Sequence, residues 1–117
     1  MQGTGSTQAM EIGAQQAPCR ADMAQAIVAY AYDITLEEMR AATRRGPRPA
    51  LARQVAMYLT HTVLSMSQTE ISEAFERHPS TVCHALHHVE DLRDDAEFDR
   101  TLDYLEAALR RAAGGAA

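Results

Sequence analysis

Apolar residues recur along this chain at helical spacing, and no segment shows the alternation of apolar and polar residues that predicts a strand. Two segments, Thr35-Leu36-Glu37-Glu38 and Ser67-Gln68-Thr69-Glu70, carry the capping-box pattern, in which the first and fourth side chains satisfy free amides at the start of a helix. A chain of 117 residues, 46% of them hydrophobic, can bury one small core. We therefore expect an all-α fold, a compact domain of about six helices.

Breaks in the apolar pattern separate the expected helices. Gly46-Pro47 and Asp94-Asp95 are the clearest of these breaks. The helices are expected at about residues 20–32, 35–43, 49–63, 67–75, 79–93 and 98–111. The inward stripe of the first helix is predicted to be Met23, Ile27 and Tyr30. That of the last helix is predicted to be Phe98, Leu102, Leu105 and Leu109.

Composition sets the domain limits and the protein class. Residues 1–18 are rich in Gln, Gly, Thr, Ser and Ala, a composition that predicts a flexible N-terminal tail. The folded domain is expected over residues 19–113, and residues 114–117 are expected to form a flexible C-terminal tail. The sequence shows no membrane span, no secretory signal and no Walker loop. Cys19 and Cys83 are too few for a disulfide scaffold and are not spaced as in a zinc finger. A cytoplasmic protein without membrane attachment is expected.

Charge is distributed unevenly along the chain. The formal net charge is −5, and all 11 basic residues are arginines. Five of them fall in residues 40–53, where there is no acid: Arg40, Arg44, Arg45, Arg48 and Arg53. From Asp94 onward, six acids outnumber three arginines. The basic stretch is an electrostatic footprint that phosphate could use, although most charge clusters are only solvated loops.

Residues 67–93 have the pattern of a helix-turn-helix. A short capped helix is followed by a tight turn at Glu76-Arg77-His78 and by a second helix that begins at Pro79-Ser80-Thr81. The inner arc of the second helix is predicted to be Val82, Leu86, Val89 and Arg93. Its opposite face is predicted to carry Ser80, His84 and His87. In such a unit the first helix braces the second, which presents polar side chains to the major groove, but the same geometry occurs in proteins that never touch DNA.

Three segments of the chain occur in the same order as in a known family. They are Arg53-Gln54-Val55-Ala56-Met57-Tyr58-Leu59, Glu70-Ile71-Ser72-Glu73-Ala74-Phe75 and Ser80-Thr81-Val82-Cys83-His84-Ala85. From about residue 23 to residue 95 the chain resembles the C-terminal DNA-binding domain of the bacterial replication initiator DnaA. The resemblance implies a helix-turn-helix whose second helix reads bases in the major groove. It also implies a basic loop that binds the minor groove beside that helix.

The chain departs from this family pattern at the turn and at the recognition helix. The turn is one residue short, and His78-Pro79 stand where the family has an Asp-His pair. Pro79 has no polar side chain and no N–H, so we expect a different base preference. His87-His88 replace an Arg-Lys pair, which weakens the attraction to phosphate at neutral pH. The ATPase and oligomerisation regions of the initiator have no counterpart in this sequence, so a stand-alone module is expected.

The predicted DNA contacts come from the basic cluster (Arg44, Arg45 and Arg48), from the start of the helix after Ser67, and from the recognition helix with its turn. The full set is Arg44, Arg45, Arg48, Arg53, Ser67, Gln68, Arg77, His78, Pro79, Ser80, Thr81, His84, His87 and His88. Arginine suits narrow minor grooves and phosphate forks. Ser80 and Thr81 also suit a helix start, and a capping role is compatible with a DNA contact.

The histidines at 84, 87 and 88 allow three interpretations. His84 and His88 share a helix face and could ligate a metal, but no distant partner is indicated, so no metal site or other cofactor is expected. A DNA-facing surface whose charge rises as pH falls is favoured over plain exposed histidines. Cys83 lacks an oriented base, so no catalytic residue and no enzymatic activity are expected.

The preferred hypothesis is a bacterial transcriptional regulator, associated with the nucleoid, that binds double-stranded DNA in a sequence-specific manner. Because the cationic contacts are few, a single module should bind DNA weakly by itself. We therefore expect a second source of affinity: a homodimer partner, tandem sites on the DNA, RNA polymerase or a regulatory protein. The alternative is a protein-interaction module that kept the fold and modulates the initiator or RNA polymerase through its last helix. The net charge of −5 and the His78-Pro79 departure support this alternative.

Overall fold

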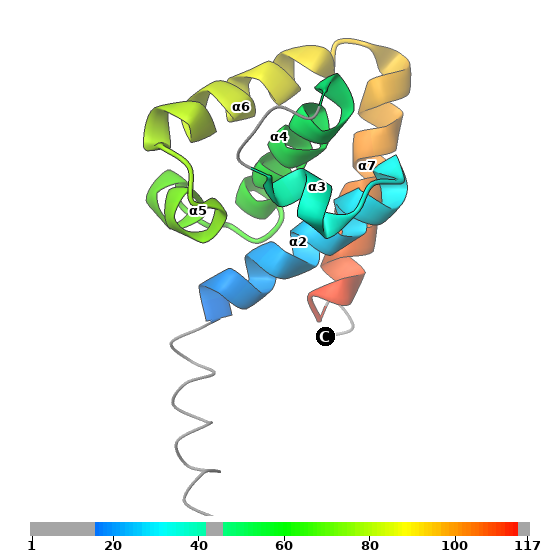
Figure 1. Cartoon of the computed structure of the whole chain (residues 1–117). Helices are drawn as coiled ribbons and strands as arrows, with labels where there is room; N and C mark the ends of the chain where they lie inside the picture. The colour runs from blue at the N-terminus through cyan, green and yellow to red at the C-terminus, as the bar shows by residue number, and fades with distance from the viewer. Residues whose placement is uncertain (1–15, 42–45, 115–117) are drawn as a thin grey trace, which may run out of the picture.

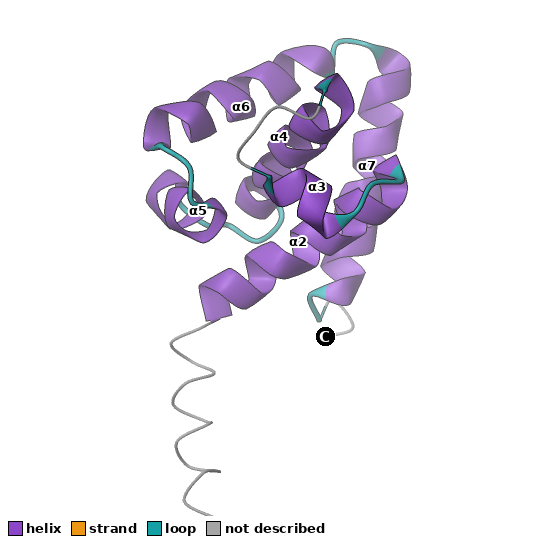
Figure 2. Cartoon of the chain, viewed as in Figure 1, coloured by secondary structure: helices purple, strands orange, loops and turns teal. Residues whose placement is uncertain are grey.

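The computed structural model describes residues 16–41 and 46–114, with side-chain surroundings from residue 20 onward. These residues form α2 (Gln16–Tyr32), α3 (Leu36–Arg40), α4 (Pro47–Thr62), α5 (Gln68–Phe75), α6 (Pro79–Leu92) and α7 (Ala96–Ala112) (Figure 1). No strand occurs among them (Figure 2). The prediction of an all-α fold with about six helices is confirmed. None of the described helices is long and apolar enough to cross a membrane.

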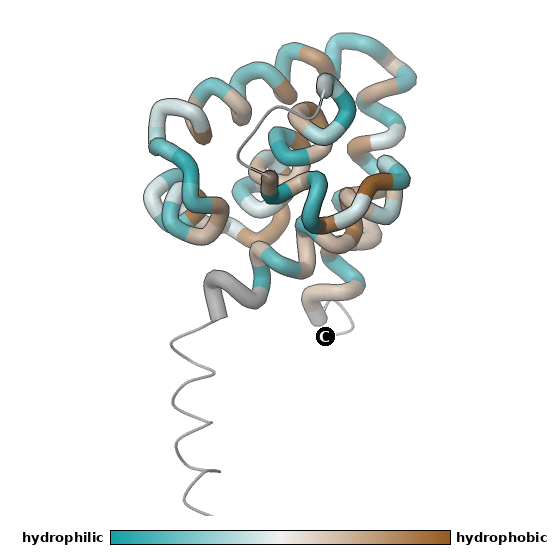
Figure 3. Tube along the Cα trace, in the orientation of Figure 1, coloured by the Kyte–Doolittle hydropathy of each residue, from teal (hydrophilic) through white to brown (hydrophobic). Residues whose placement is uncertain are grey.

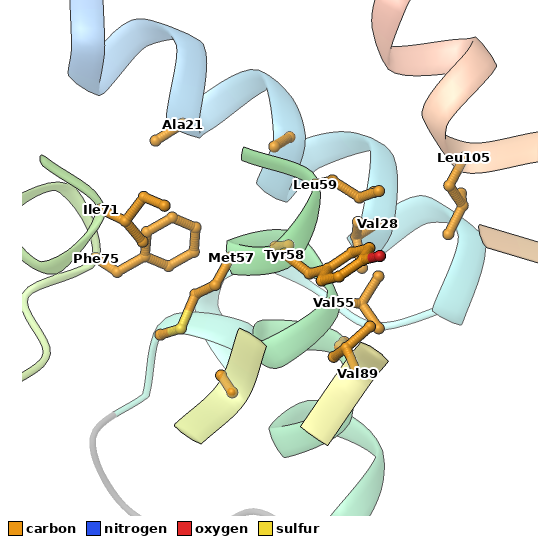
Figure 4. Packing of buried hydrophobic residues seen from close by; sticks show 14 of the residues in the cluster. Ala21, Val28, Val55, Met57, Tyr58, Leu59, Ile71, Phe75, Val89 and Leu105 are labelled. Atoms are coloured by element: carbon orange, nitrogen blue, oxygen red, sulfur yellow. The ribbon is translucent and has the colours of Figure 1, made fainter. Parts of the chain in front are cut away.

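Helix α4 lies at the centre of the core. Residues 55–60 of this helix are all buried, because α2, α3, α5, α6 and α7 each pack against it. Val55 and Leu59 of α4 lie in one cluster with Val28 of α2 and Val89 of α6 (Figure 4). The burial of this apolar surface is the main force that holds the helices together.

The buried face of α2 differs from the predicted one. Tyr30 is 89% exposed, so its predicted inward orientation is wrong, and Met23 and Ile27 are only partly buried. The face that enters the core is instead made of small residues, Ala21, Ala24 and Val28. Small side chains let α2 approach α4 closely. A prediction of the buried face that considers only the large apolar residues does not find these small ones.

The first turn of α2 reaches into the segment that the sequence assigns to the N-terminal tail. The helix begins at Gln16 and therefore includes Pro18. Proline is tolerated there because the first amides of a helix have no intrahelical partner, so its missing N–H costs no helical hydrogen bond. Helix α2 therefore begins three residues before residue 19, where the sequence analysis starts the folded domain.

The end of α3 and the start of α4 both differ from the predicted bounds. α3 ends at Arg40 instead of near residue 43, because Ala41 is extended and Arg53 of α4 donates hydrogen bonds to carbonyls at this end. α4 begins at Pro47, two residues earlier than predicted. Gly46, which precedes it, has a φ of +106°, a value that favours glycine.

Helices α5 and α6 form the predicted helix-turn-helix. The Ser67 capping box is present: Ser67 Oγ accepts from the Glu70 N–H (3.1 Å), and Glu70 Oε1 accepts from the Ser67 N–H (2.8 Å). The bracing side chains are buried as expected: Ile71, Phe75, Val82 and Leu86. Along α6 the chain changes between hydrophobic and hydrophilic with the turns of the helix, so one face packs and the other remains polar (Figure 3).

The turn between α5 and α6 is tight and locally strained. Glu76 adopts the left-handed conformation (φ +55°, ψ +49°), which costs a residue other than glycine about 1 kcal/mol. The Arg77 N–H donates to the Ser72 carbonyl (3.0 Å), and Ser72 Oγ donates to the Arg77 carbonyl (2.5 Å). Both polar groups of the Arg77 backbone are therefore held by α5.

Arg93, at the end of α6, joins that helix to α4 and α7. Its side chain is only 14% exposed and forms ion pairs with Asp99, Asp103 and Glu106 of α7. It also donates to the Tyr58 hydroxyl of α4 (3.4 Å). Burial alone would lower the pKa of Arg93, but its hydrogen bonds and the charge of Glu106 raise that pKa above the usual value. These acids of α7 thus help to hold the fold together.

Replacing Arg93 by Met should lower the free energy of unfolding by about 2 kcal/mol, because three carboxylates would lose their shared cation while the apolar stem is kept. Urea denaturation followed by circular dichroism measures the change. Asp103→Asn is the control, since Asp103 is 64% exposed and its ion pair should contribute less than about 1 kcal/mol. Equal losses in the two variants would contradict the assigned role of Arg93.

Candidate nucleic-acid interface

The outward face of α6 is polar beyond its first residue, Pro79, which is also exposed. Its exposed polar residues are Ser80, Thr81, His84, His87, His88, Glu90 and Asp91. Its buried residues are Val82, Ala85, Leu86 and Val89. The predicted separation of the two faces is therefore present, and the exposed face has the donors and acceptors that contacts to base edges and phosphates require.

The start of α6 is capped by a residue that the sequence analysis did not assign to this role. His78 is the N-cap, and its Nδ1 accepts from the Ser80 N–H (3.1 Å) and lies 2.9 Å from Ser80 Oγ. The capping role considered for Ser80 and Thr81 thus belongs to His78. Pro79 occupies the first position of the helix, where its missing N–H has no cost. The hydroxyl of Thr81 is exposed and takes no part in this cap.

The histidines farther along α6 pair within the helix. The rings of His84 and His88 stack with an interplanar angle of 4° and centroids 6.1 Å apart. His87 Nδ1 lies 3.8 Å from Cys83 Sγ. Among the described residues, no three His, Cys, Asp or Glu side chains come together in a way that could hold a metal ion. The face is therefore an exposed imidazole surface that follows the N-terminal end of the helix.

A second polar surface lies at the start of α5. Ser67 and Gln68 are both exposed, as their predicted contact with DNA requires. The Ser67 oxygen accepts a bond in the capping box, which leaves its hydroxyl proton able to donate to a phosphate. Two helix starts, those of α5 and α6, thus present exposed hydroxyl groups.

The predicted basic cluster is described only in part. Arg44 and Arg45 lie outside the described residues, while Arg48 is exposed in the first turn of α4. Arg53, five residues farther along, is half-buried and donates from Nε to the Met39 carbonyl (2.8 Å) and from Nη2 to the Ala41 carbonyl (3.1 Å). The structure thus gives Arg53 an intramolecular role that its predicted contact with DNA did not include.

Arg77 has a similar second role. It is half-buried, and its Nη2 donates to the same Ala41 carbonyl (3.1 Å). Burial lowers the pKa of Arg53, and the nearby charge of Arg77 lowers it further. No local sequence pattern predicts the carbonyl of Ala41 as a partner of Arg77, because the two residues lie 36 positions apart. The hydroxyl of Ser72 lies only five positions from the Arg77 carbonyl that it binds, but the sequence analysis did not assign it a partner.

A cleft of about 260 Å³ lies beside this meeting point, between α2, α3 and the turn before α6. Its charged lining is mixed: Asp22, Arg40, Arg53, Glu76 and Arg77. Arg40 is already paired with Asp22 (3.1 Å) and bonded to Gln25. Because two acids and three arginines line the cleft together, it lacks the single sign of charge that a phosphate pocket requires.

Comparisons with known proteins indicate one family. The family described as bacterial dnaA protein helix-turn-helix matches residues 21–89. The chromosomal replication initiator protein DnaA of Bordetella pertussis is 40% identical over 88 residues, which are 74% of this chain and 19% of that protein. The same protein of Aquifex aeolicus is 37% identical over 81 residues, which are 68% of this chain and 20% of that protein. The chain thus spans about a fifth of the length of these curated relatives.

Two solved structures share the fold over nearly the whole described chain. One, a crystal structure of a DNA replication initiation factor, has a TM-score of 0.76 and 30% identity, covering 86% of this chain and 31% of that one. The other, replication initiator DnaA bound to AMPPCP and single-stranded DNA, has a TM-score of 0.74 and 28% identity with the same coverage. From the matched residues and the shared fold, the chain belongs to the bacterial DnaA helix-turn-helix family.

Proposed function

We propose that this protein binds double-stranded DNA in a sequence-specific manner and regulates transcription. The observation that carries the proposal is the exposed polar face of α6, held by the buried face of α5 in a helix-turn-helix of the DnaA family. Such a helix fits the major groove, where each base pair presents its own pattern of donors and acceptors. A protein that acts in this way would be associated with the nucleoid.

The base-reading residues are proposed to be His78, Ser80 and Thr81, which lie exposed at the start of α6. The N-terminal residues of a recognition helix are those that approach base edges most closely. Pro79 lies among them and can offer only an apolar contact, such as one with a thymine methyl group. We therefore infer a preferred site that differs from the box bound by the initiator.

The backbone contacts are proposed to come from the basic cluster and from the start of α5. Arg48 is exposed, and Arg44 and Arg45 precede it in the sequence, separated from it by Gly46-Pro47. Arginine can enter a narrow minor groove or bind phosphates bidentately. These contacts release counterions, so most of the affinity should be salt-sensitive.

We infer that the protein acts by binding and not by catalysis. Cys83 and His87 are neighbours on α6, but no further group orients the imidazole as a base in the described part of the chain. With few cationic contacts, tight binding should need a homodimer mate, tandem sites, or a partner such as RNA polymerase or a regulatory protein.

A protein-interaction module is the second candidate, and the surface of α7 favours it. Tyr104 is 73% exposed on this helix, beside Arg100, Asp103 and Ala107. An exposed aromatic side chain with charged neighbours suits a protein contact better than a DNA contact. In this case the chain would modulate the initiator or RNA polymerase without strong DNA binding of its own.

Selection from a random duplex pool with the purified chain, at low and moderate salt, should enrich one motif. The spacing of the enriched half-sites would distinguish a monomer from a dimer. Salt-sensitive binding without a motif would remove sequence specificity from the proposal and leave a module that depends on a partner. The absence of binding at either salt concentration would favour the protein-interaction candidate.

The triple replacement of Arg44, Arg45 and Arg48 by Ala should weaken duplex binding at least about tenfold. It should also make the salt slope about 2 to 3 units less steep, because each phosphate contact contributes about 0.9 unit. Fluorescence anisotropy over a salt series measures both quantities.

The matched control for this experiment removes the same charge from the opposite part of the molecule. Arg100, Arg110 and Arg111 are exposed on α7, away from the helix-turn-helix. Their replacement by Ala should leave the salt slope within about 0.5 unit of the unaltered value. If both triple variants lose binding equally, net charge and not a localised cluster accounts for the affinity.

A further inference from the structure

We propose that the exposed face of α7 is the surface through which two copies of this chain pair, in antiparallel orientation about a two-fold axis at Tyr104. The inference deepens the proposed function, which leaves the second source of affinity open among several partners. It assigns that source to a second copy of the chain. The test needs no DNA, so this inference and the proposed function can fail separately.

Helix α7 buries one face and leaves the other without a partner in the described part of the chain. Its buried residues are Leu102, Leu105 and Leu109, and the helix packs on α2 and α4. The residues of the opposite face are all exposed: Glu97, Arg100, Thr101, Tyr104, Ala107, Ala108 and Arg111. Tyr104, at the centre of this face, is 73% exposed. A partner that covered this ring would gain the burial of a large aromatic side chain.

The charges of this face complement themselves when one copy is turned around. Glu97 lies seven residues before Tyr104, and Arg111 lies seven residues after it. Seven residues are about two helical turns, so the three side chains lie within roughly 20° of one line, with each charge about 10 Å from Tyr104 along the axis. In an antiparallel pair centred on Tyr104, Glu97 of each copy therefore lies beside Arg111 of the other. A parallel pair would place like charges together.

Both charges are available for such a contact. Glu97 and Arg111 take part in no ion pair among the described residues, whereas the other acids at the middle of α7 bind Arg93. The helix dipole also favours an acid at the start of a helix and a base at its end, so the charges alone would not define an interface. The dipole does not explain the exposed Tyr104 midway between them.

The surface beside Tyr104 has the shape that this pair needs. An open hollow of about 310 Å³ is lined by Arg100, Asp103, Tyr104 and Ala107. These residues follow the spacing i, i+3, i+4 and i+7, which is the set that forms the hole for a side chain of a facing helix. In the register that joins Glu97 to Arg111, Tyr104 of the second copy lies opposite this hollow. The small side chain of Ala107 lets the two backbones approach closely.

The pair should be weak without DNA and cooperative on it. Helix α7 has 17 residues and is therefore about 25 Å long. One pair of such helices buries less than about 1,200 Å², as transient complexes do, so the dissociation constant should be micromolar or weaker. The polar face of α6 is not part of the pairing surface and stays free in both copies. Two copies on adjacent sites would hold each other in place, and their two-fold symmetry predicts inverted half-sites.

Sedimentation equilibrium of the unaltered full chain, from about 10 µM to about 1 mM, should show a concentration-dependent dimer. Glu97→Arg and Arg111→Glu should each weaken the association at least about tenfold, because two ion pairs become two repulsive contacts. The double variant that carries both changes should associate within about threefold of the unaltered chain, because exchanging the signs restores the complementarity.

A loss of structure predicts the opposite order among these variants. Each reversal opposes the helix dipole, so the double variant should have the least stable α7. If the double variant associates more weakly than either single variant, the antiparallel pairing is overturned. Circular dichroism of all three variants measures how much helix each retains.

The second test removes the central side chain. Tyr104→Ala should weaken self-association at least about tenfold, because residues at the centre of an interface contribute most of its binding energy. Tyr30→Ala is the matched control: Tyr30 is an 89% exposed tyrosine on α2, and its loss should change the association less than about twofold. Equal losses in the two variants, or an unaltered chain that stays monomeric at about 1 mM, overturn the inference.

Measurements on DNA separate this inference from the proposed function. Tyr104→Ala should keep the affinity for a duplex with one site and lose the cooperativity on a duplex with two inverted sites. The variant that lacks Arg100, Arg110 and Arg111 should behave in the same way, because a single site holds no second copy. Unchanged cooperativity in Tyr104→Ala would overturn the role of the pair on DNA. A chain that dimerises but binds no duplex would remove the proposed function and leave the pairing surface intact.

Discussion

The burial of α4 between residues 55 and 60 is the constraint on which the other helices depend. Because α2, α3, α5, α6 and α7 all pack on this helix, each of them buries one face in the core. For α6 the buried face includes Val82 and Val89, and the polar face is therefore turned outward. The surface proposed for DNA is thus a consequence of hydrophobic burial on the opposite side of the same helix.

Arginine side chains donate hydrogen bonds to backbone carbonyls near the ends of helices in this fold. Arg20 Nη2 donates to the carbonyl of Leu64, beyond the end of α4 (2.8 Å), and Arg53 binds carbonyls at the end of α3. Helix ends leave carbonyl groups without intrahelical partners, and a long side chain with several donors can reach them from another element. A chain whose basic residues are all arginine uses them for architecture as well as for charge.

The features that the sequence predicted correctly are local ones. The Thr35 and Ser67 capping boxes need only residues three positions apart, and the two faces of α6 follow from helical periodicity. The helix-turn-helix combines these signals over a short stretch of chain, and its family resemblance is confirmed by the matched residues.

The features that the sequence missed depend on packing between distant segments. The predicted inward orientation of Tyr30 was wrong because small residues, not large ones, form the close contact between α2 and α4. The shared carbonyl of Ala41 was missed because an arginine in a loop has the same sequence signature whether it faces solvent or another element. At the site, exposure could be predicted from the pattern, but the partners of the arginines could not.

The cap at His78 fixes more than the start of α6. Because Nδ1 accepts the Ser80 N–H, the proton of the neutral ring resides on Nε2. The ring nitrogen that remains for an external partner is therefore a donor. The carboxylate that the family pattern has at this place is an acceptor. One substitution thus reverses the hydrogen-bonding polarity at the start of α6. In the function proposed above, this end of the helix would complement acceptor atoms of a groove instead of amino groups.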